Sequence, residues 1–292
     1  MLTYTPPLFR PPSEAKSLIL QVTLGCSWNK CSFCEMYTTK QFQPRNFDNI
    51  KKDIEQAQSE WPSPDKIFLA DGDALVLSKN KLLPILELLH AKFPKVKQIS
   101  SYATPQNVLK KSDQDLADIH AAGLNMLYYG VESGDNVILN KIQKGVDAQG
   151  VCDGIIKARG AGFKISTTNL LGIAGKKYTK QHALNTAKIL SQANPEYISF
   201  LMIMFPLGDE RFLNAFGNDY EALDQLELIQ ELRNTLANLE VKDSEIRANH
   251  ASNYLPIKAL FPKDKVATLA VIDDVLNNPD PSKLRPEFLR GL

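Results

Sequence analysis

The chain of 292 residues lacks any apolar run near the roughly 20 residues that a membrane-spanning helix needs. It also lacks an excess of charge: 34 Lys and Arg against 33 Asp and Glu give a net charge of +1, so we expect no general attraction to nucleic acid or to a membrane surface. Residues 1–12 contain no apolar stretch behind a basic start, and no secretory signal is expected.

Cysteine is scarce, with four in the whole chain, and three of them lie within residues 26–34. This distribution does not fit a disulfide framework. It favours a reducing compartment and a metal site near the amino terminus, and we therefore expect a cytoplasmic protein. The share of hydrophobic residues, 43%, is enough for a sizeable core.

From residue 18 to residue 205, short β-branched or aromatic runs alternate with stretches that carry apolar residues at helical spacing. Six such units can be counted. Strands that each lead through a helix to the next strand require a parallel sheet with right-handed crossovers. The pattern predicts an α/β fold, a partial (β/α)6 TIM-like barrel, with functional residues directly after the strands. The predicted strands are 18–24, 66–69, 96–102, 126–131, 163–171 and 197–204, and the helices are 47–60, 79–92, one from 112, 148–159 and 180–192.

Beyond Pro206 the alternation stops. Helices are predicted over 220–239 and 263–276, and the segment 245–260 has no clear period. We therefore divide the chain into an amino-terminal extension (1–16), a core barrel (17–205) and a mainly helical carboxyl-terminal extension (206–292). The last part is expected to cover the barrel and to shape the substrate site.

The loop after the first predicted strand places Cys26, Cys31 and Cys34 close together in sequence. Thiolates are soft ligands that select iron-sulfur clusters, zinc or Cu(I). A closed zinc site would need a fourth ligand, and no second cysteine pair exists. Cys152 and the histidines at 90, 120 and 182 fall within predicted helices, where core or surface roles are expected.

Three cysteines without a fourth suit a [4Fe-4S] cluster with one iron open to another ligand. Here the chain resembles the radical S-adenosylmethionine (radical SAM) superfamily, whose signature is a three-cysteine loop after the first barrel strand, with an aromatic residue before the last cysteine. Phe33 occupies the aromatic position. The usual first spacing is three residues, whereas Cys26 and Cys31 enclose four. The resemblance spans residues 18–205 and implies S-adenosylmethionine (SAM) as a cofactor.

Three further loops resemble superfamily segments that hold this cofactor. Asp71-Gly72-Asp73 follows the second strand, where an acidic turn would bind the amino group of the methionyl part, and Asp73 is the candidate for that contact. The same residues also suit an ordinary turn. Glu132 and Ser133 end the fourth strand, and a salt bridge is the alternative role for the glutamate. Ile173 lies in the glycine-containing stretch that would pack on the adenine ring.

The resemblance implies an enzyme that reductively cleaves SAM to a 5′-deoxyadenosyl radical, which takes hydrogen from a small-molecule substrate. An electron donor such as flavodoxin or ferredoxin is implied as a partner. In the carboxyl-terminal extension His250 lies in a polar cluster and is the candidate for proton transfer, although a structural loop histidine is an equal alternative. Two other classes stay open: a non-catalytic iron-sulfur electron carrier or sensor, and a zinc-stabilised binding module.

Overall fold

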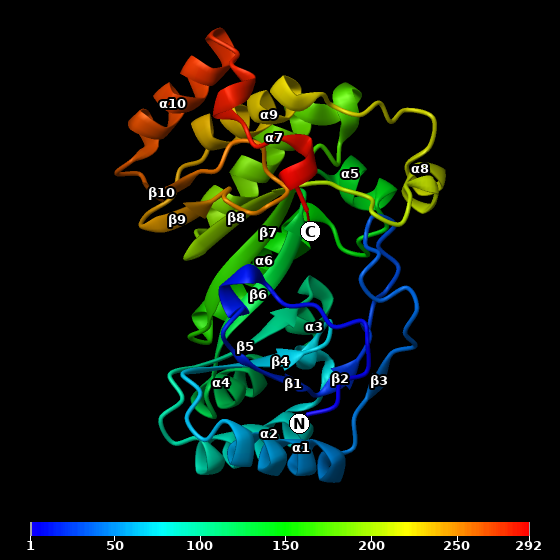
Figure 1. Ribbon diagram of the computed structural model, residues 1–292, viewed down its shortest axis with the longest axis vertical. Helices are drawn as coiled ribbons and strands as arrows, with labels where there is room; N and C mark the ends of the chain where they lie inside the picture. Colours follow the sequence, from blue (N-terminus) through cyan, green and yellow to red (C-terminus); the bar gives the residue numbers. More distant parts are fainter. Residues whose placement is uncertain (1, 292) are drawn as a thin grey trace. The chain divides into compact units, whose positions relative to one another are not determined.

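The computed structural model describes residues 2–291, whose strands form one eight-stranded sheet and one two-stranded sheet (Figure 1). The order in the large sheet is β1-β4-β5-β6-β7-β8-β9-β10. Pairing is parallel from β1 to β6 and from β7 to β9, and β10 is antiparallel to β9. The strands are β1 (Leu18–Gln21), β2 (Thr23–Leu24), β3 (Gln43–Pro44), β4 (Lys66–Ala70), β5 (Gln98–Ala103), β6 (Leu124–Glu132), β7 (Lys164–Leu171), β8 (Tyr197–Met202), β9 (Ser244–Arg247) and β10 (Lys258–Phe261).

Helices follow most strands, as the alternating pattern predicts, and the α/β prediction is confirmed. Their starts carry the expected signals: the Ser112 hydroxyl accepts from the Asp115 amide at the start of α4, and Asp224 forms a capping box with Glu227 at the start of α9. The helices are α1 (Phe47–Glu60), α2 (Lys79–Lys92), α3 (Pro105–Lys110), α4 (Asp113–Ala121), α5 (Asn136–Lys141), α6 (Ala148–Gly160), α7 (Gly175–Ala193), α8 (Glu210–Phe216), α9 (Gln225–Ala237) and α10 (Lys265–Asn277).

The carboxyl-terminal extension contributes to the sheet, which sequence periodicity did not indicate. Residues 245–260 lack a clear period because they include two strands of only four residues each, separated by a loop. β9 pairs in parallel with β8, and β10 pairs antiparallel with β9 as the last strand of the sheet. The extension is therefore helical in its bulk but continues the barrel sheet.

The amino-terminal segment is fixed through one buried carboxylate. Glu14 is fully buried in a short 3-10 helix and accepts hydrogen bonds from the Tyr128 hydroxyl (2.5 Å), the Gln98 amide (2.9 Å) and Ser17. A buried carboxylate is tolerated only where donors replace its water shell. This network attaches residues 12–17 to strands β5 and β6.

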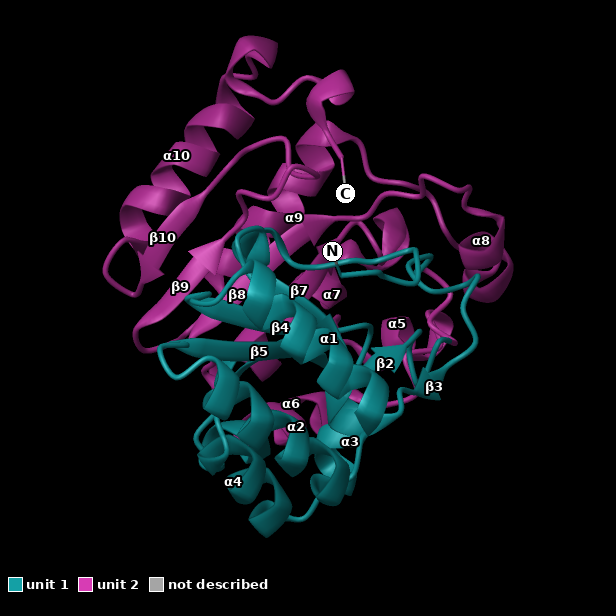
Figure 2. Ribbon diagram, turned by 60° about the horizontal axis from the view of Figure 1, so that its bottom comes forward, with its two compact units in different colours: residues 1–29, 34–130, 157–165 teal, residues 30–33, 131–156, 166–292 magenta. Residues whose placement is uncertain are grey.

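Contacts divide the chain into two compact units, shown in separate colours in Figure 2. Unit 1 comprises residues 1–29, 34–130 and 157–165, and unit 2 comprises residues 30–33, 131–156 and 166–292. Each has its own apolar core, with Phe68 fully buried in unit 1 and Phe200 almost fully buried in unit 2. The division expected from the sequence after residues 16 and 205 stays a prediction. Within the described residues, no helix has the length and apolar character to cross a membrane.

Candidate cluster and cofactor site

The three loop cysteines and Cys152 lie in different surroundings. Cys26, Cys31 and Cys34 are half-buried, whereas Cys152 is buried within α6 with its sulfur 3.7 Å from the carbonyl oxygen of Ile189. Burial raises the pKa of the Cys152 thiol to about 11, so it stays protonated and is a poor metal ligand. The loop cysteines are the ones that solvent and a cofactor can reach.

Tyr37 reports on the neighbourhood of two of these cysteines. Burial and then the negative charge of Asp71 raise its pKa well above the usual value, and Cys26 and Cys34 act in the same direction. Both thiols therefore lie near the Tyr37 ring. Among residues 2–291, no three His, Cys, Asp or Glu side chains are gathered as ligands of a single metal ion. The assignment of all three thiolates to one cluster therefore stays a prediction.

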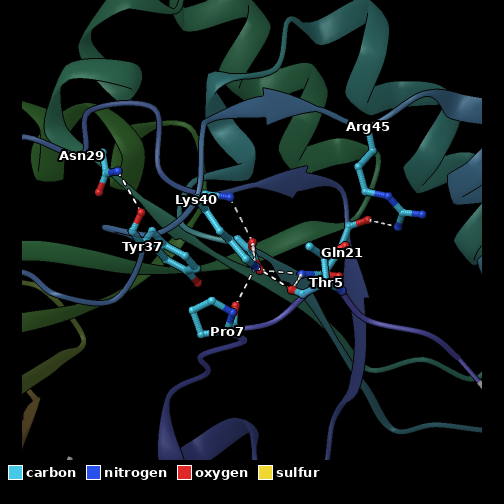
Figure 3. A network of polar contacts seen from close by, with 9 residues as sticks. Thr5, Pro7, Gln21, Asn29, Tyr37, Lys40 and Arg45 are labelled. Atoms are coloured by element: carbon cyan, nitrogen blue, oxygen red, sulfur yellow. Dashed lines mark hydrogen bonds and ion pairs between the residues drawn. The ribbon is translucent and has the colours of Figure 1, made fainter.

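Asp71 fixes both ends of the cysteine loop. Figure 3 shows its partners Lys40 and Gln21 with the neighbouring Thr5 and Pro7. Its fully buried carboxylate accepts from the Gly25 amide (3.0 Å), from Lys40 Nζ (2.7 Å) and from Gln21 Nε2 (2.9 Å). Lys40 also donates to the carbonyl oxygens of Thr5 and Pro7, each at 2.6 Å. These donors occupy both carboxylate oxygens of Asp71, so its observed role is to hold the loop.

Gly72 allows the turn after β4 to pack directly on the cysteine loop. Its amide donates to the Gly25 carbonyl (3.1 Å), and a Cβ atom here would lie 2.8 Å from the Cys26 Cβ and 3.0 Å from the Cys26 Cα. Neither neighbour is the flexible end of a side chain, so a larger residue must displace the loop.

We expect Gly72→Ala to reduce the iron bound per chain after anaerobic reconstitution by more than about half, because the added methyl group moves Cys26. Gly160→Ala is the matched control, since nothing lies within 4 Å of a Cβ built there. Iron analysis and thermal melting of both variants provide the test. Equal iron content in the two variants would show that the close packing is unimportant for the cluster.

Asp73 offers the clearest feature of a binding site. It is fully buried, and its Oδ2 accepts from Thr104 Oγ1 (2.9 Å), from Ser27 Oγ (3.3 Å) and from the Asn107 side-chain amide. Among the described residues 2–291, its Oδ1 is buried without a hydrogen-bond partner. Burial raises the pKa of the carboxyl group to about 6. A buried acceptor without a donor is costly unless a ligand supplies one.

The candidates in unit 2 begin with Glu132, at the carboxyl end of β6. Its φ of 65° lies in the left-handed region, which is uncommon for a non-glycine residue and points to a constrained strand end. Lys144 Nζ lies 2.9 Å from Glu132 Oε1, and both side chains are less than 10% exposed. The alternative considered for the sequence, a salt bridge to a neighbouring loop, is therefore present.

Side chains of α7 and α9 form hydrogen bonds to Ser133 and to the turn after β7. Ser133 Oγ lies 2.8 Å from His182 Nδ1, so the buried His182 of α7 has a structural role. Glu231 of α9 is fully buried and accepts from the Gly172 amide (2.7 Å) and from Thr179 Oγ1 (2.5 Å). Ile173, next to Gly172, is buried in the same turn. The extension thus fixes the backbone directly before the adenine candidate.

The remaining candidates differ in exposure. Phe33 is half-buried in unit 2. His250 is half-buried in the loop after β9, where its Nδ1 accepts from the Ser252 amide (3.1 Å). Burial, with a smaller contribution from the positive charge of Arg285, lowers the pKa of His250 below its usual range. The imidazole is therefore neutral near pH 7 and carries its proton on Nε2.

Sequence reasoning missed two partners of these candidates. Asn107, which binds Asp73, lies in α3, a six-residue helix too short to show a period; its Thr104-Pro105 start is the signal that could have found it. Glu231 looks in sequence like any polar residue of an amphipathic helix. Only the fold brings it to the Gly172 turn.

Comparison with known proteins decides the family. The model of the radical SAM superfamily matches residues 20–188, more than half of the chain. The chain belongs to the radical SAM superfamily. The C-x4-C-x2-C spacing of Cys26, Cys31 and Cys34 falls inside the matched residues.

The chain is similar to the heme chaperone HemW of Bacillus subtilis, with 26% identity over 60% of this chain and 48% of the relative. It is similar in fold to coproporphyrinogen III oxidase HemN from Escherichia coli (TM-score 0.58, 16% identity, 76% of this chain and 51% of that one). Methylornithine synthase PylB is also similar (TM-score 0.52, 15% identity, 77% and 63%). The chain spans about half the length of the curated relatives that it matches. These radical SAM structures support the partial-barrel fold.

The residues present fit the cofactors that the superfamily implies. Three half-buried thiols supply the soft ligands of an iron-sulfur cluster. The unpartnered Asp73 Oδ1 supplies an acceptor for a cationic amino group, next to the turn that contacts Cys26.

Proposed function

We propose that this chain is a radical SAM enzyme that reductively cleaves SAM at a [4Fe-4S] cluster held by Cys26, Cys31 and Cys34. The observation that carries the proposal is the buried, unpartnered Oδ1 of Asp73, one residue after the glycine that packs on Cys26. When bound, the cluster supplies an electron that breaks the sulfonium bond of SAM.

The protein residues bind and orient the cofactors. Asp73 accepts from the methionyl amino group, while Asp71 holds the loop that carries the cysteines. Glu132 and Ser133 bind the ribose side, with Lys144 holding the glutamate in place through a buried ion pair. Ile173 packs on the adenine ring, and Phe33 shields the cluster from water.

A small molecule is the proposed substrate, and His250 is the residue proposed to transfer a proton to it. The Ser252 amide occupies its Nδ1, so the proton-bearing Nε2 is the end that can act. Arg285 donates to the carbonyl oxygens of His250 (2.7 Å), Ala251 (2.9 Å) and Asn253 (2.5 Å) and thereby fixes the loop. A loop held by several bonds keeps a proton donor at a constant distance from its target.

A second candidate follows from the names of the curated relatives, which are heme chaperones. The match covers 60% of this chain, and the superfamily model covers residues 20–188. Heme binding without turnover is therefore the rival that a test must separate from SAM cleavage.

The test is anaerobic reconstitution with iron and sulfide, followed by addition of SAM and dithionite. We expect a brown protein that forms 5′-deoxyadenosine and methionine in equal amounts, and reduced flavodoxin to replace dithionite. A brown protein that leaves SAM intact indicates an electron carrier or sensor, and a colourless protein containing zinc indicates a binding module. Tight binding of added heme by a protein that does not cleave SAM would favour the chaperone function.

A further inference from the structure

Strands β8 and β9 of unit 2 have one buried face and one half-exposed face, and Thr168 of the neighbouring β7 is half-exposed as well. In β8, Ile198, Phe200 and Met202 are at most 1% exposed, whereas the alternating residues Tyr197, Ser199 and Leu201 are half-exposed. Successive side chains of a strand point to opposite faces of the sheet. The half-exposed residues therefore identify the open face.

A row of polar side chains crosses this open face. The strand register pairs Thr168 of β7 with Ser199 of β8, Ser199 with Arg247 of β9, and Arg247 with Lys258 of β10. Paired residues point to the same face, and neighbouring strands lie about 4.8 Å apart. Two hydroxyl groups and two cationic groups thus stand side by side at one depth of the sheet.

The groups of this row retain unused hydrogen-bonding capacity. Arg247 donates from Nε to Glu245 Oε1 (2.5 Å), and its guanidinium carbon lies 4.0 Å from the Tyr197 ring centroid. Within residues 2–291, neither Nη atom of Arg247 and neither hydroxyl of Thr168 or Ser199 has a hydrogen-bond partner. The stacking and the single bond hold the guanidinium in place while four of its N–H groups stay available.

We propose that this row binds the carboxylate of the substrate, an inference that rests on the proposed radical SAM function. Arg247 and Lys258 face one acidic residue, Glu245, which lies 3.6 Å from Lys258 Nζ, so the row carries one surplus positive charge. One surplus charge matches a carboxylate better than the two charges of a phosphate monoester. The planar guanidinium also matches a carboxylate in bidentate geometry.

The same register places the rest of the substrate. The half-exposed Leu201 and its buried partner Leu170 form the next row, two residues closer to the carboxyl ends of β8 and β7. That step is about 6.6 Å. A carbon chain anchored at Arg247 extends over these leucines towards the strand ends, where the cofactor candidate Ile173 follows β7. The hydrogen to be abstracted lies at that end of the substrate.

The test measures binding without turnover. Reconstituted protein with SAM and no reductant is mixed with the small-molecule fraction of a cell extract, previously split on an anion exchanger, and compounds retained on ultrafiltration are identified by mass spectrometry. We expect a retained compound from the anionic portion that survives phosphatase treatment. Its retention is expected to fall at least about 10-fold in Arg247→Gln and about threefold in Ser199→Ala, with partial recovery in Arg247→Lys.

Arg233→Gln is the matched control, because it removes an arginine ion pair of α9 with Asp273 (2.8 Å) that lies outside the row. Thermal melting shows whether each variant is folded. If the Arg247→Gln protein does not fold, the Ser199→Ala variant still tests the site. A retained compound that is neutral or is destroyed by phosphatase, equal retention in the row variants, or no retention by wild-type protein that cleaves SAM would each overturn the carboxylate site. Wild-type protein that fails to cleave SAM with dithionite would instead refute the proposed function.

Discussion

Cys31→Ala is expected to abolish the reductive cleavage of SAM, with 5′-deoxyadenosine formation falling to the level of protein-free controls. The same loss is expected for Cys26→Ala and Cys34→Ala, because three protein thiolates are the minimum that leaves one iron open for the cofactor and no other cysteine of the chain lies in the loop. The measurement is anaerobic reconstitution followed by iron and sulfide analysis and by quantification of 5′-deoxyadenosine.

Cys152→Ala provides the control, since this buried thiol has a pKa raised to about 11 by burial and lies within α6. We expect it to bind iron and cleave SAM as the wild type does. Normal cleavage by the Cys31→Ala protein would mean that the ligand set is wrong, and the C-x4-C-x2-C spacing would then have misled the assignment.

The elements with strong periodicity were predictable from the sequence. Helices α1 and α2 have the predicted bounds, since both have apolar residues at helical spacing and end before a change in pattern. The start of α7 was placed five residues too late, at Lys180 instead of Gly175. Gly175 has a φ of 62° and directly follows a turn over residues 172–174, so composition alone suggested a loop there.

The candidate site was predictable only where chemistry is concentrated in short motifs. The cysteines and Asp73 could be proposed as site residues from the sequence because thiolates and acidic strand-end turns are distinctive. The different roles of Asp71 and Asp73 could not be predicted from the sequence, because both residues are acidic, lie two positions apart and are buried. Only the three-dimensional partners separate them: Asp71 is saturated by donors, whereas Asp73 keeps an unpartnered oxygen.

The row on β7–β10 could not be read from the sequence at all. Thr168, Ser199 and Arg247 are about 30 and 50 residues apart along the chain and become neighbours through strand register. β9 itself is four residues long and gave no periodic signal. The local sequence pattern does not show which distant strands pair with one another.

Asp73→Asn is expected to weaken SAM binding by at least about 30-fold, because the amide cannot balance the positive amino group in a buried site. The dissociation constant is measured by equilibrium dialysis of labelled SAM with reconstituted, unreduced protein. Asp153→Asn, an exposed substitution on α6, is the matched control and should bind as the wild type does.

The pH dependence of this binding follows from the same carboxyl group. Burial raises the pKa of Asp73 to about 6 from an ordinary value of 3.8. In the ligand-free protein its ionised form is therefore unfavourable, and folding gains up to about 3 kcal/mol from this group as the pH falls from above 6 to below 4. SAM binding has the opposite sign, because the cationic amino group requires the ionised carboxylate.

We therefore expect the dissociation constant of wild-type protein to be constant between pH 6 and pH 7 and to rise about tenfold per unit below pH 6, while folding of the ligand-free protein becomes more favourable as the pH falls below 6. In Asp73→Asn this dependence disappears, since no proton has to leave before the amino group binds. A wild-type affinity that does not change between pH 5 and pH 7, or an Asp73→Asn protein with the wild-type profile, would show that the amino group binds elsewhere.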